Sequence, residues 1–185
     1  MNFSNQKKTY LSKLDKSKKG SIDEKIKELL SVINSKNEYY TTSSCSGRVV
    51  LLSCNGKKNE TEWLKVSHDL IGEEFFELEK VDKSQELIWL RVEPLILHIC
   101  CKDLNCANEL LETAKLIYKK SCLLSFQNKI ILEIRGSEFM EMPFMKEGER
   151  LYCGEISYLV ELVNEKMKKI FRGIEKFEEK IGKIY

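Results

Sequence analysis

A run of small polar residues that ends in an arginine, Ser43-Ser44-Cys45-Ser46-Gly47-Arg48, carries the densest set of reactive groups in this sequence. It separates a threonine-rich stretch from an apolar one, so we expect a turn between two strands. Backbone N–H groups of such a turn, together with an arginine fork, can bind a carboxylate or a phosphate. An ordinary polar hairpin loop is the alternative. A reactive thiol at Cys45, with its thiolate favoured by Arg48, is a third interpretation, but no histidine neighbours Cys45 in the sequence.

The other candidates for proton chemistry are two histidines and one glutamate. His68 and His98 each end an apolar, strand-like stretch, where a histidine is more often a hydrogen-bonded rim residue than a catalytic group. Glu93, between Val92 and Pro94, is costly inside an apolar strand unless it has a partner or a function. Regular alternation would place Glu93 and His98 on opposite faces, whereas a bulge at the proline would bring them together.

Several common site motifs are absent from the sequence. It has no Gly-x-Gly-x-x-Gly after a first strand, no Walker A run and no defensible Ser/His/Asp order. It also has no Cys-x-x-Cys and only two histidines, so we predict no metal site. The residues alone therefore indicate an anion-binding turn and name no reaction.

Composition describes a protein large enough for one well-buried core. Of the 185 residues, 42% are hydrophobic, and 31 Lys+Arg against 29 Asp+Glu leave a net charge of +2, so global charge indicates no nucleic-acid partner. Lysines are concentrated at both ends of the chain. They either form solvent-exposed helix faces or bind the phosphate backbone of a nucleic acid. Seven cysteines without a signal peptide, and no apolar run of membrane-spanning length, predict a cytoplasmic protein with reduced thiols.

The first half of the chain predicts one helix and a hairpin. Ser21-x-x-Glu24 has the spacing of a capping box, and the apolar stripe after it predicts a helix over 22–36. Strands are expected over 39–42, 49–52 and 63–68, with a hairpin turn at Asn55-Gly56. A short helix is expected over 73–81.

The second half predicts a buried strand over 87–101, interrupted by an edge or a bulge at Glu93-Pro94. A helix over about 104–119 and further strands with a turn at Gln127-Asn128 follow. A heptad seam then predicts a long helix over about 155–182, packed against its own subunit or against a partner; we favour the former and a monomer. The prediction is one α+β domain over 1–185, perhaps bilobal, with a mixed or antiparallel sheet, flanking helices and a long C-terminal helix.

The order of these motifs resembles the tRNA wybutosine-synthesizing protein 3 family over most of the chain. The matches are Asp15-x-Ser-x-Lys19-Gly-x-x-Asp23, then Tyr40–Arg48, Trp63 with His68, Glu93-Pro94-x-x-Leu97-His98, an Arg-ended strand at Arg135, Pro143, and a terminal helix with Asn164 and Met167. One departure is visible. Where the family has Gly-Phe-x-x-Ser-Gly, this chain has Ile117-Tyr118-Lys119-Lys120-Ser121-Cys122, which puts cofactor affinity or substrate preference in doubt.

The resemblance implies an S-adenosylmethionine-dependent methyltransferase that is not of the Rossmann type. It would methylate N4 of 7-(3-amino-3-carboxypropyl)-4-demethylwyosine at position 37, in the anticodon loop of phenylalanine tRNA. The protein would align the nitrogen with the methyl carbon and accept a proton. The alternatives are a non-catalytic tRNA-binding module that presents the modified loop to another wybutosine enzyme, and a thiol enzyme using Cys45.

On this resemblance the candidate residues fall into three groups. His68, Glu93 and His98 are the candidates for the base or for orienting it. An anion, either the cofactor carboxylate or a tRNA phosphate, would be held by Arg48 and by the turn Ser43, Ser44, Cys45, Ser46, Gly47. The cofactor would be bound, or that turn positioned, by Asp15, Lys19 and Asp23. Trp63 or Trp89 would stack on the base, Arg135 would contact the substrate, and the terminal lysines would hold the tRNA backbone.

Overall fold

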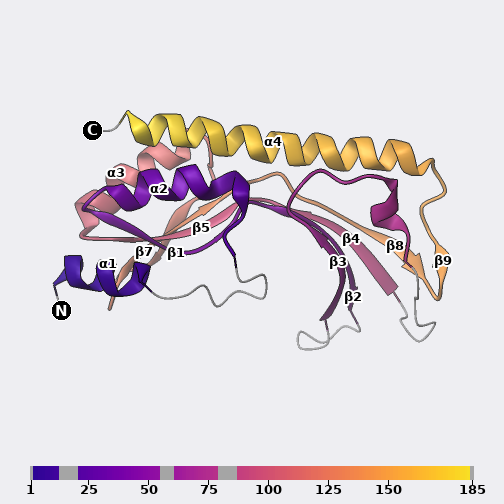
Figure 1. Ribbon diagram of the computed structural model, residues 1–185, viewed down its shortest axis with the longest axis horizontal. Helices are drawn as coiled ribbons and strands as arrows, with labels where there is room; N and C mark the ends of the chain where they lie inside the picture. The colour runs from indigo at the N-terminus through magenta and orange to yellow at the C-terminus, as the bar shows by residue number, and fades with distance from the viewer. Residues whose placement is uncertain (1, 13–20, 55–60, 79–86, 184–185) are drawn as a thin grey trace. The chain divides into compact units, whose positions relative to one another are not determined.

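The computed structural model describes residues 2–12, 21–54, 61–78 and 87–183 (Figure 1). The chain forms two compact units. Unit 1 comprises Met1–Ser46, Leu95–Ser137 and Ile170–Tyr185, and unit 2 comprises Gly47–Pro94 and Glu138–Lys169. The predicted turn at Asn55-Gly56, and the candidates Asp15 and Lys19, lie outside the described residues.

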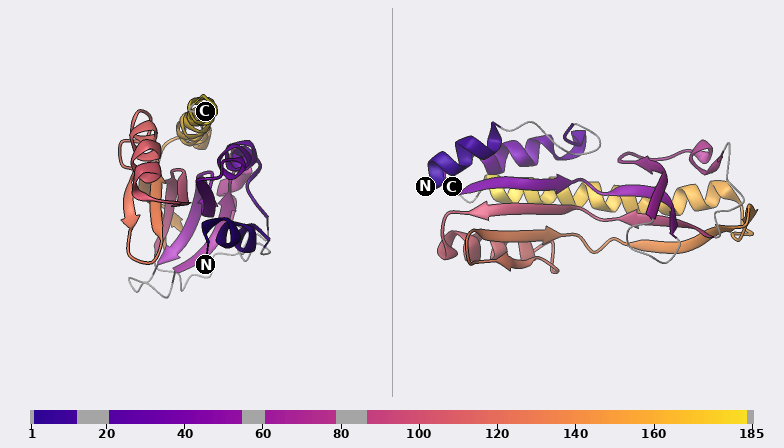
Figure 2. Two further views of the ribbon diagram at one scale, coloured as in Figure 1. Left: turned by 90° about the vertical axis from the view of Figure 1, so that its left-hand side faces the viewer. Right: turned by 90° about the horizontal axis from the view of Figure 1, so that it is seen from below.

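Unit 1 is built on a four-stranded antiparallel sheet in the order β1-β5-β7-β6. The strands are β1 (Tyr39–Cys45), β5 (Ile96–Cys101), β6 (Cys122–Ser125) and β7 (Ile130–Arg135). The hairpin between β6 and β7 confirms the predicted turn at Gln127-Asn128. Helices α2 (Lys27–Ser35) and α3 (Leu104–Lys115) lie on one side of the sheet, and α1 (Phe3–Leu11) lies on the other (Figures 1 and 2). Tyr40 is fully buried where α1 covers β1, with its ring 5.4 Å from those of Phe3 and Tyr10.

Unit 2 is built on a five-stranded antiparallel sheet in the order β3-β2-β4-β8-β9. The strands are β2 (Arg48–Cys54), β3 (Thr61–Ser67), β4 (Leu87–Glu93), β8 (Met140–Lys146) and β9 (Glu149–Arg150). Residues alternate along β4, where Ile88, Leu90 and Val92 are buried and the residues between them are half-exposed. One face of β4 therefore belongs to the core and the other carries Arg91 and Glu93, whereas Val49, Val50, Leu51 and Leu52 on β2 are all buried.

The long helix α4 (Ile156–Gly182) confirms the predicted heptad stripe. Val163 and Met167 are buried in unit 2, and Ile170, Ile174 and Phe177 in unit 1. Asn164 anchors the first part, because its side chain accepts from the Ile71 N–H (2.9 Å) and donates to the Ile71 carbonyl (2.8 Å). The stripe is thus covered by its own chain.

The α+β class and the long terminal helix are confirmed, and every strand pairing among the described residues is antiparallel. A Rossmann-type fold requires a mainly parallel sheet, so this is a different architecture. In the described part of the chain, no helix has the length and apolarity needed to span a bilayer.

Three local predictions were wrong. The stretch 87–101 is not one interrupted strand: β4 ends at Glu93 in one sheet and β5 begins at Ile96 in the other, since proline cannot donate to either ladder. The run Ser43–Arg48 is not a turn either, because β1 continues to Cys45 and β2 starts at Arg48 in the other sheet, which also excludes a hairpin.

The third error concerns short helices. The first turn after Ser21 is the 3₁₀ helix η1 (Glu24–Ile26), whose N-cap is Asp23 and not Ser21. The Asp23 side chain makes no capping hydrogen bond, and its carboxylate accepts from Ser46 instead. Helix α1 was not predicted, since residues 5–18 have few apolar positions. The helix expected over 73–81 is the 3₁₀ helix η2 (Glu73–Phe76), and residues 79–81 lie outside the described part.

Candidate functional site

The link between β1 and β2 is only two residues long, Ser46 and Gly47. The Ser46 N–H and hydroxyl donate to the same Asp23 carboxylate oxygen, at 2.9 and 3.1 Å, and both residues are buried. Gly47 has φ of 101°, a backbone conformation that side chains with a Cβ rarely adopt. The backbone N–H of Ser46 thus binds a carboxylate of the protein itself, whereas the sequence predicted an anion of the cofactor or the tRNA.

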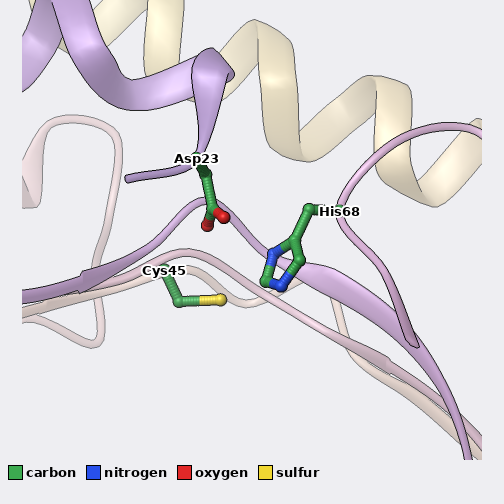
Figure 3. Close-up of side chains that lie close together, drawn as sticks. All are labelled: Asp23, Cys45 and His68. Carbon is green, nitrogen blue, oxygen red and sulfur yellow. The ribbon is translucent and has the colours of Figure 1, made fainter. Parts of the chain in front are cut away.

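Cys45 lies at the end of β1 and shares this corner of unit 1. Its sulfur lies within 4.8 Å of a carboxylate oxygen of Asp23, and Figure 3 shows that carboxylate directed towards the end of β1. Reactive cysteines usually lie beside positive charges or helix N-termini. Within unit 1, this carboxylate is the opposite kind of neighbour and does not favour the thiolate of Cys45.

Arg48 opens β2 in unit 2 and sits directly opposite Glu93 in the ladder with β4. Its Nε donates to Glu93 Oε2 at 2.6 Å, and its guanidinium carbon lies 4.1 Å from the centre of the Trp63 ring. The partner that a carboxylate in an apolar strand requires is therefore Arg48. The side chains of Arg48 and Glu93 remain 23% and 27% exposed, so the pair can be reached from solvent.

His68 follows the end of β3 in unit 2. Its Nδ1 lies 3.1 Å from the carbonyl oxygen of Gly47 (ring drawn in Figure 3). A carbonyl only accepts hydrogen bonds, so Nδ1 carries the hydrogen and Nε2 is the basic nitrogen of the neutral ring.

His98 lies on β5 in unit 1, between side chains of the two neighbouring strands. Its Nδ1 is 2.7 Å from the hydroxyl of Ser43 on β1, and its Nε2 is 3.0 Å from Glu133 Oε2 on β7. The register pairs His98 with both residues directly, so the three side chains form a row across the sheet. Arg135, also on β7 and 54% exposed, places Nη1 3.9 Å from the other oxygen of Glu133.

The predicted site residues thus fall into two sets. Unit 1 carries Asp23 with Ser46 and Cys45, and the row around His98. Unit 2 carries Gly47 with His68, and Arg48 with Glu93 and Trp63. Ser44 is exposed near the end of β1 and Trp89 is half-buried on β4; within the described part of the chain, neither has a side-chain polar contact that defines a role for it.

Glu133 was missed by the sequence analysis. The signal was the alternation in Ile131-Leu132-Glu133-Ile134-Arg135, which puts two charged residues on one face of an otherwise apolar strand. Its pairing with a histidine 35 positions earlier depends on strand register, which local patterns do not give.

Comparison with known proteins identifies the family. The model of the family described as methyltransferase TYW3 matches residues 5–183. The chain belongs to this family. A tRNA(Phe) 7-((3-amino-3-carboxypropyl)-4-demethylwyosine(37)-N(4))-methyltransferase from Thermococcus sibiricus is 36% identical, over 99% of this chain and 96% of its own length. A tRNA wybutosine-synthesizing protein 3 homolog from Danio rerio is 33% identical, over 96% of this chain and 73% of its own length.

Solved structures agree with the fold of this TYW3 family member. The PH1069 protein from Pyrococcus horikoshii is 34% identical and superposes with a TM-score of 0.84, over 97% of this chain and 96% of that one. A hypothetical protein from Aeropyrum pernix is 25% identical, with a TM-score of 0.72, over 86% of this chain and 97% of that one. The resemblance drawn from the sequence motifs is confirmed.

The segment in which this TYW3 protein lacks the expected glycines is only partly packed: Ile117 is half-buried and Cys122 is exposed, whereas Tyr118 and Ser121 between them are buried. Tyr118 is buried and meets Phe177 of α4 edge to face, with ring centres 5.5 Å apart. A Cβ at Gly173 would lie 3.0 Å from the Tyr118 hydroxyl oxygen, so the small residue on α4 makes room for the large one. Burial also raises the pKa of the Tyr118 hydroxyl, which stays neutral.

Proposed function

We propose that this protein is an S-adenosylmethionine-dependent methyltransferase of wybutosine synthesis. Its substrate would be phenylalanine tRNA, in which it methylates N4 of 7-(3-amino-3-carboxypropyl)-4-demethylwyosine at position 37. The observation that carries the proposal is the near full-length match to methyltransferases of this name from Thermococcus sibiricus and, at 35% identity, from Pyrococcus horikoshii. Because these relatives are named as enzymes, a non-catalytic module is not favoured.

Arg48 is our candidate for holding an anionic group of cofactor or substrate. The guanidinium has five N–H donors, and Glu93 takes the one on Nε, so the fork retains donors for a carboxylate or phosphate. The Trp63 ring covers one side of the Arg48 guanidinium and so limits the orientation of its plane. This donor set suits the methionine carboxylate of S-adenosylmethionine or an anticodon-loop phosphate. Glu93, held in an ion pair, would orient Arg48 rather than act as the base.

The base would be a histidine. S-adenosylmethionine, when bound, supplies a methyl group on a sulfonium, which a correctly aligned nitrogen can attack without covalent help from the protein. The residues must then exclude water, align the nitrogen and accept its proton. The candidates are His68, whose Nδ1 contacts the Gly47 carbonyl, and His98, whose Nδ1 contacts the Ser43 hydroxyl. Asp23 would position the β1–β2 link.

The remaining candidate residues would contact the tRNA. Trp63, 43% exposed, would stack on the tricyclic base, and Arg135 would contact the tRNA. Exposed cations on α4, together with the N-terminal lysines, would hold the phosphate backbone; those on α4 are Lys168, Lys169, Arg172, Lys176 and Lys180. We also propose a cytoplasmic monomer made of one bilobal domain.

The test is direct methyl transfer, followed by nucleoside mass spectrometry. Purified protein is incubated with S-adenosylmethionine and phenylalanine tRNA carrying the unmethylated tricyclic intermediate. We expect the intermediate to gain one methyl group on N4, and tRNA with unmodified guanosine at the same position to gain none. Binding of the tRNA without methyl transfer would replace this proposal with the binding-module alternative.

A further inference from the structure

Glu133 is the one member of the row across the unit 1 sheet that the family motifs did not point to. Its side chain is 16% exposed and that of His98 is 25% exposed, so both are largely shielded but still reached by solvent. Ser43 at the other end of the row is exposed. The row therefore runs from a sheltered carboxylate, through an imidazole, to a hydroxyl that a ligand can reach.

The contacts define where the hydrogens lie. A carboxylate only accepts, so the hydrogen between His98 and Glu133 sits on Nε2. In the neutral ring Nδ1 then carries the lone pair and accepts the Ser43 O–H at 2.7 Å. If His98 gains a proton at Nδ1, the ring becomes a cation whose charge lies beside Glu133.

Glu133 has no other strong partner among the described residues. Arg135 approaches its second oxygen only at 3.9 Å, which leaves Oε2 to the imidazole. A shielded carboxylate costs free energy unless it is paired, and the partner here is a group that can be neutral. The Glu133 carboxylate can therefore stabilise His98 when the imidazole becomes positively charged.

We propose that Glu133 is a positioning residue for proton transfer: it fixes the Nε2–H form of His98 and stabilises the cation formed when Nδ1 takes a proton through Ser43. The inference rests on the proposed function. As the substrate nitrogen bonds to the methyl carbon, the C–S bond breaks and its electron pair stays on sulfur. The nitrogen passes its proton to the Ser43 oxygen while the hydroxyl proton moves to His98 Nδ1. One proton thus leaves the substrate nitrogen and one proton is gained by His98, and Ser43 is unchanged.

The kinetic test is a double-mutant cycle on single-turnover methyl transfer. Glu133→Met keeps the chain length but removes the carboxylate. We expect the single-turnover rate to fall by roughly 10- to 100-fold, less than the about 100- to 10,000-fold typical of general acid–base catalysis because the histidine itself remains, while the KM from steady-state assays stays unchanged. Glu133→Asp should recover part of the rate. In a His98→Gln background, Glu133→Met should have no further effect, because Glu133 acts only through His98.

Glu141→Met is the matched control, since Glu141 also lies on a strand and pairs with a cation, Arg91 Nη2, at 2.6 Å. It should change the rate less than about threefold in either background. An equal loss from Glu133→Met with and without His98 would show a structural role and overturn the inference. So would an unchanged rate in Glu133→Met.

Nuclear magnetic resonance separates this inference from the proposed function. The chain has only two histidines, so ¹⁵N-labelled protein gives two sets of ring signals, and His98→Gln identifies one of them. We expect an Nε2–H proton of His98, protected from solvent exchange in the wild type, to lose that protection in Glu133→Met. Protein that shows this signal but transfers no methyl group would refute the reaction while retaining the contact. Absence of the protected proton in the wild type would refute the contact itself.

Discussion

Arg48 and Arg91 make ion pairs of the same kind on neighbouring strands of unit 2, with Glu93 and Glu141 respectively. Among the described residues, Arg48 but not Arg91 also lies over an aromatic ring, that of Trp63. The proposed function gives Arg48 a ligand to hold and gives Arg91 none. A comparison of substitutions at Arg48 and Arg91 therefore distinguishes a ligand-binding role from a purely structural one.

Replacing Arg48 by lysine tests this difference. Lysine keeps the positive charge but loses the planar fork and the ring contact, so we expect kcat/KM to fall about 10- to 100-fold, or about 1.4 to 2.7 kcal/mol. Arg91→Lys should cost less than about threefold. Steady-state methyl transfer measures both, and equal effects of the two substitutions would contradict a ligand-binding role for Arg48.

At the scale of elements, the buried hydrogen bonds of Asp23 fix the two-residue link at the end of β1. Two donors of Ser46 share one carboxylate oxygen, and neither residue is open to water. A lost acceptor would leave buried donors unsatisfied. The short link thus depends on a side chain 23 positions away in the sequence.

Asp23→Ala should lower the free energy of unfolding by about 1–3 kcal/mol, the cost of leaving buried donors without an acceptor. Urea denaturation measures the change. Asp69→Ala, at an exposed position, should stay within about 0.5 kcal/mol of the wild type. A loss for Asp23→Ala no larger than that of the control would show that the link does not depend on this carboxylate.

At the scale of the whole molecule, buried thiols make the stability of the folded protein fall as the pH becomes alkaline. Burial raises the pKa of the Cys101 thiol from its ordinary 9.0 to about 12, with smaller contributions from Cys100, Cys106 and Asp103. Below pH 9 the thiol is protonated in both states. Above it the unfolded chain loses this proton while the folded protein keeps it, so stability falls as pH rises from about 9 to about 12.

We therefore expect the free energy of unfolding, measured with urea and a reductant, to decrease from about pH 8 to about pH 10.5. Cys101→Val should make this decrease shallower because the variant has one less thiol to ionise on unfolding. Cys153→Val, at an exposed position, should leave the slope unchanged. An unchanged slope in Cys101→Val would show that this thiol is not the source.

The sequence by itself determined the elements whose signal is local. The heptad stripe of α4 and the order of the family motifs are both written in neighbouring residues, and both were confirmed. Hydrophobic periodicity reports which side of an element is buried, and that suffices for element type and class.

Only the tertiary structure decided which side chains meet. Ser43, His98 and Glu133 are separated by 55 and 35 positions and come together through the register of three strands. The carboxylate bound at the β1–β2 link, and the division of 87–101 between two sheets, likewise depend on pairing over long sequence distances. Register is set by the packing of whole faces, because a one-residue slip would turn every side chain of a strand to the other face, and no local pattern specifies it.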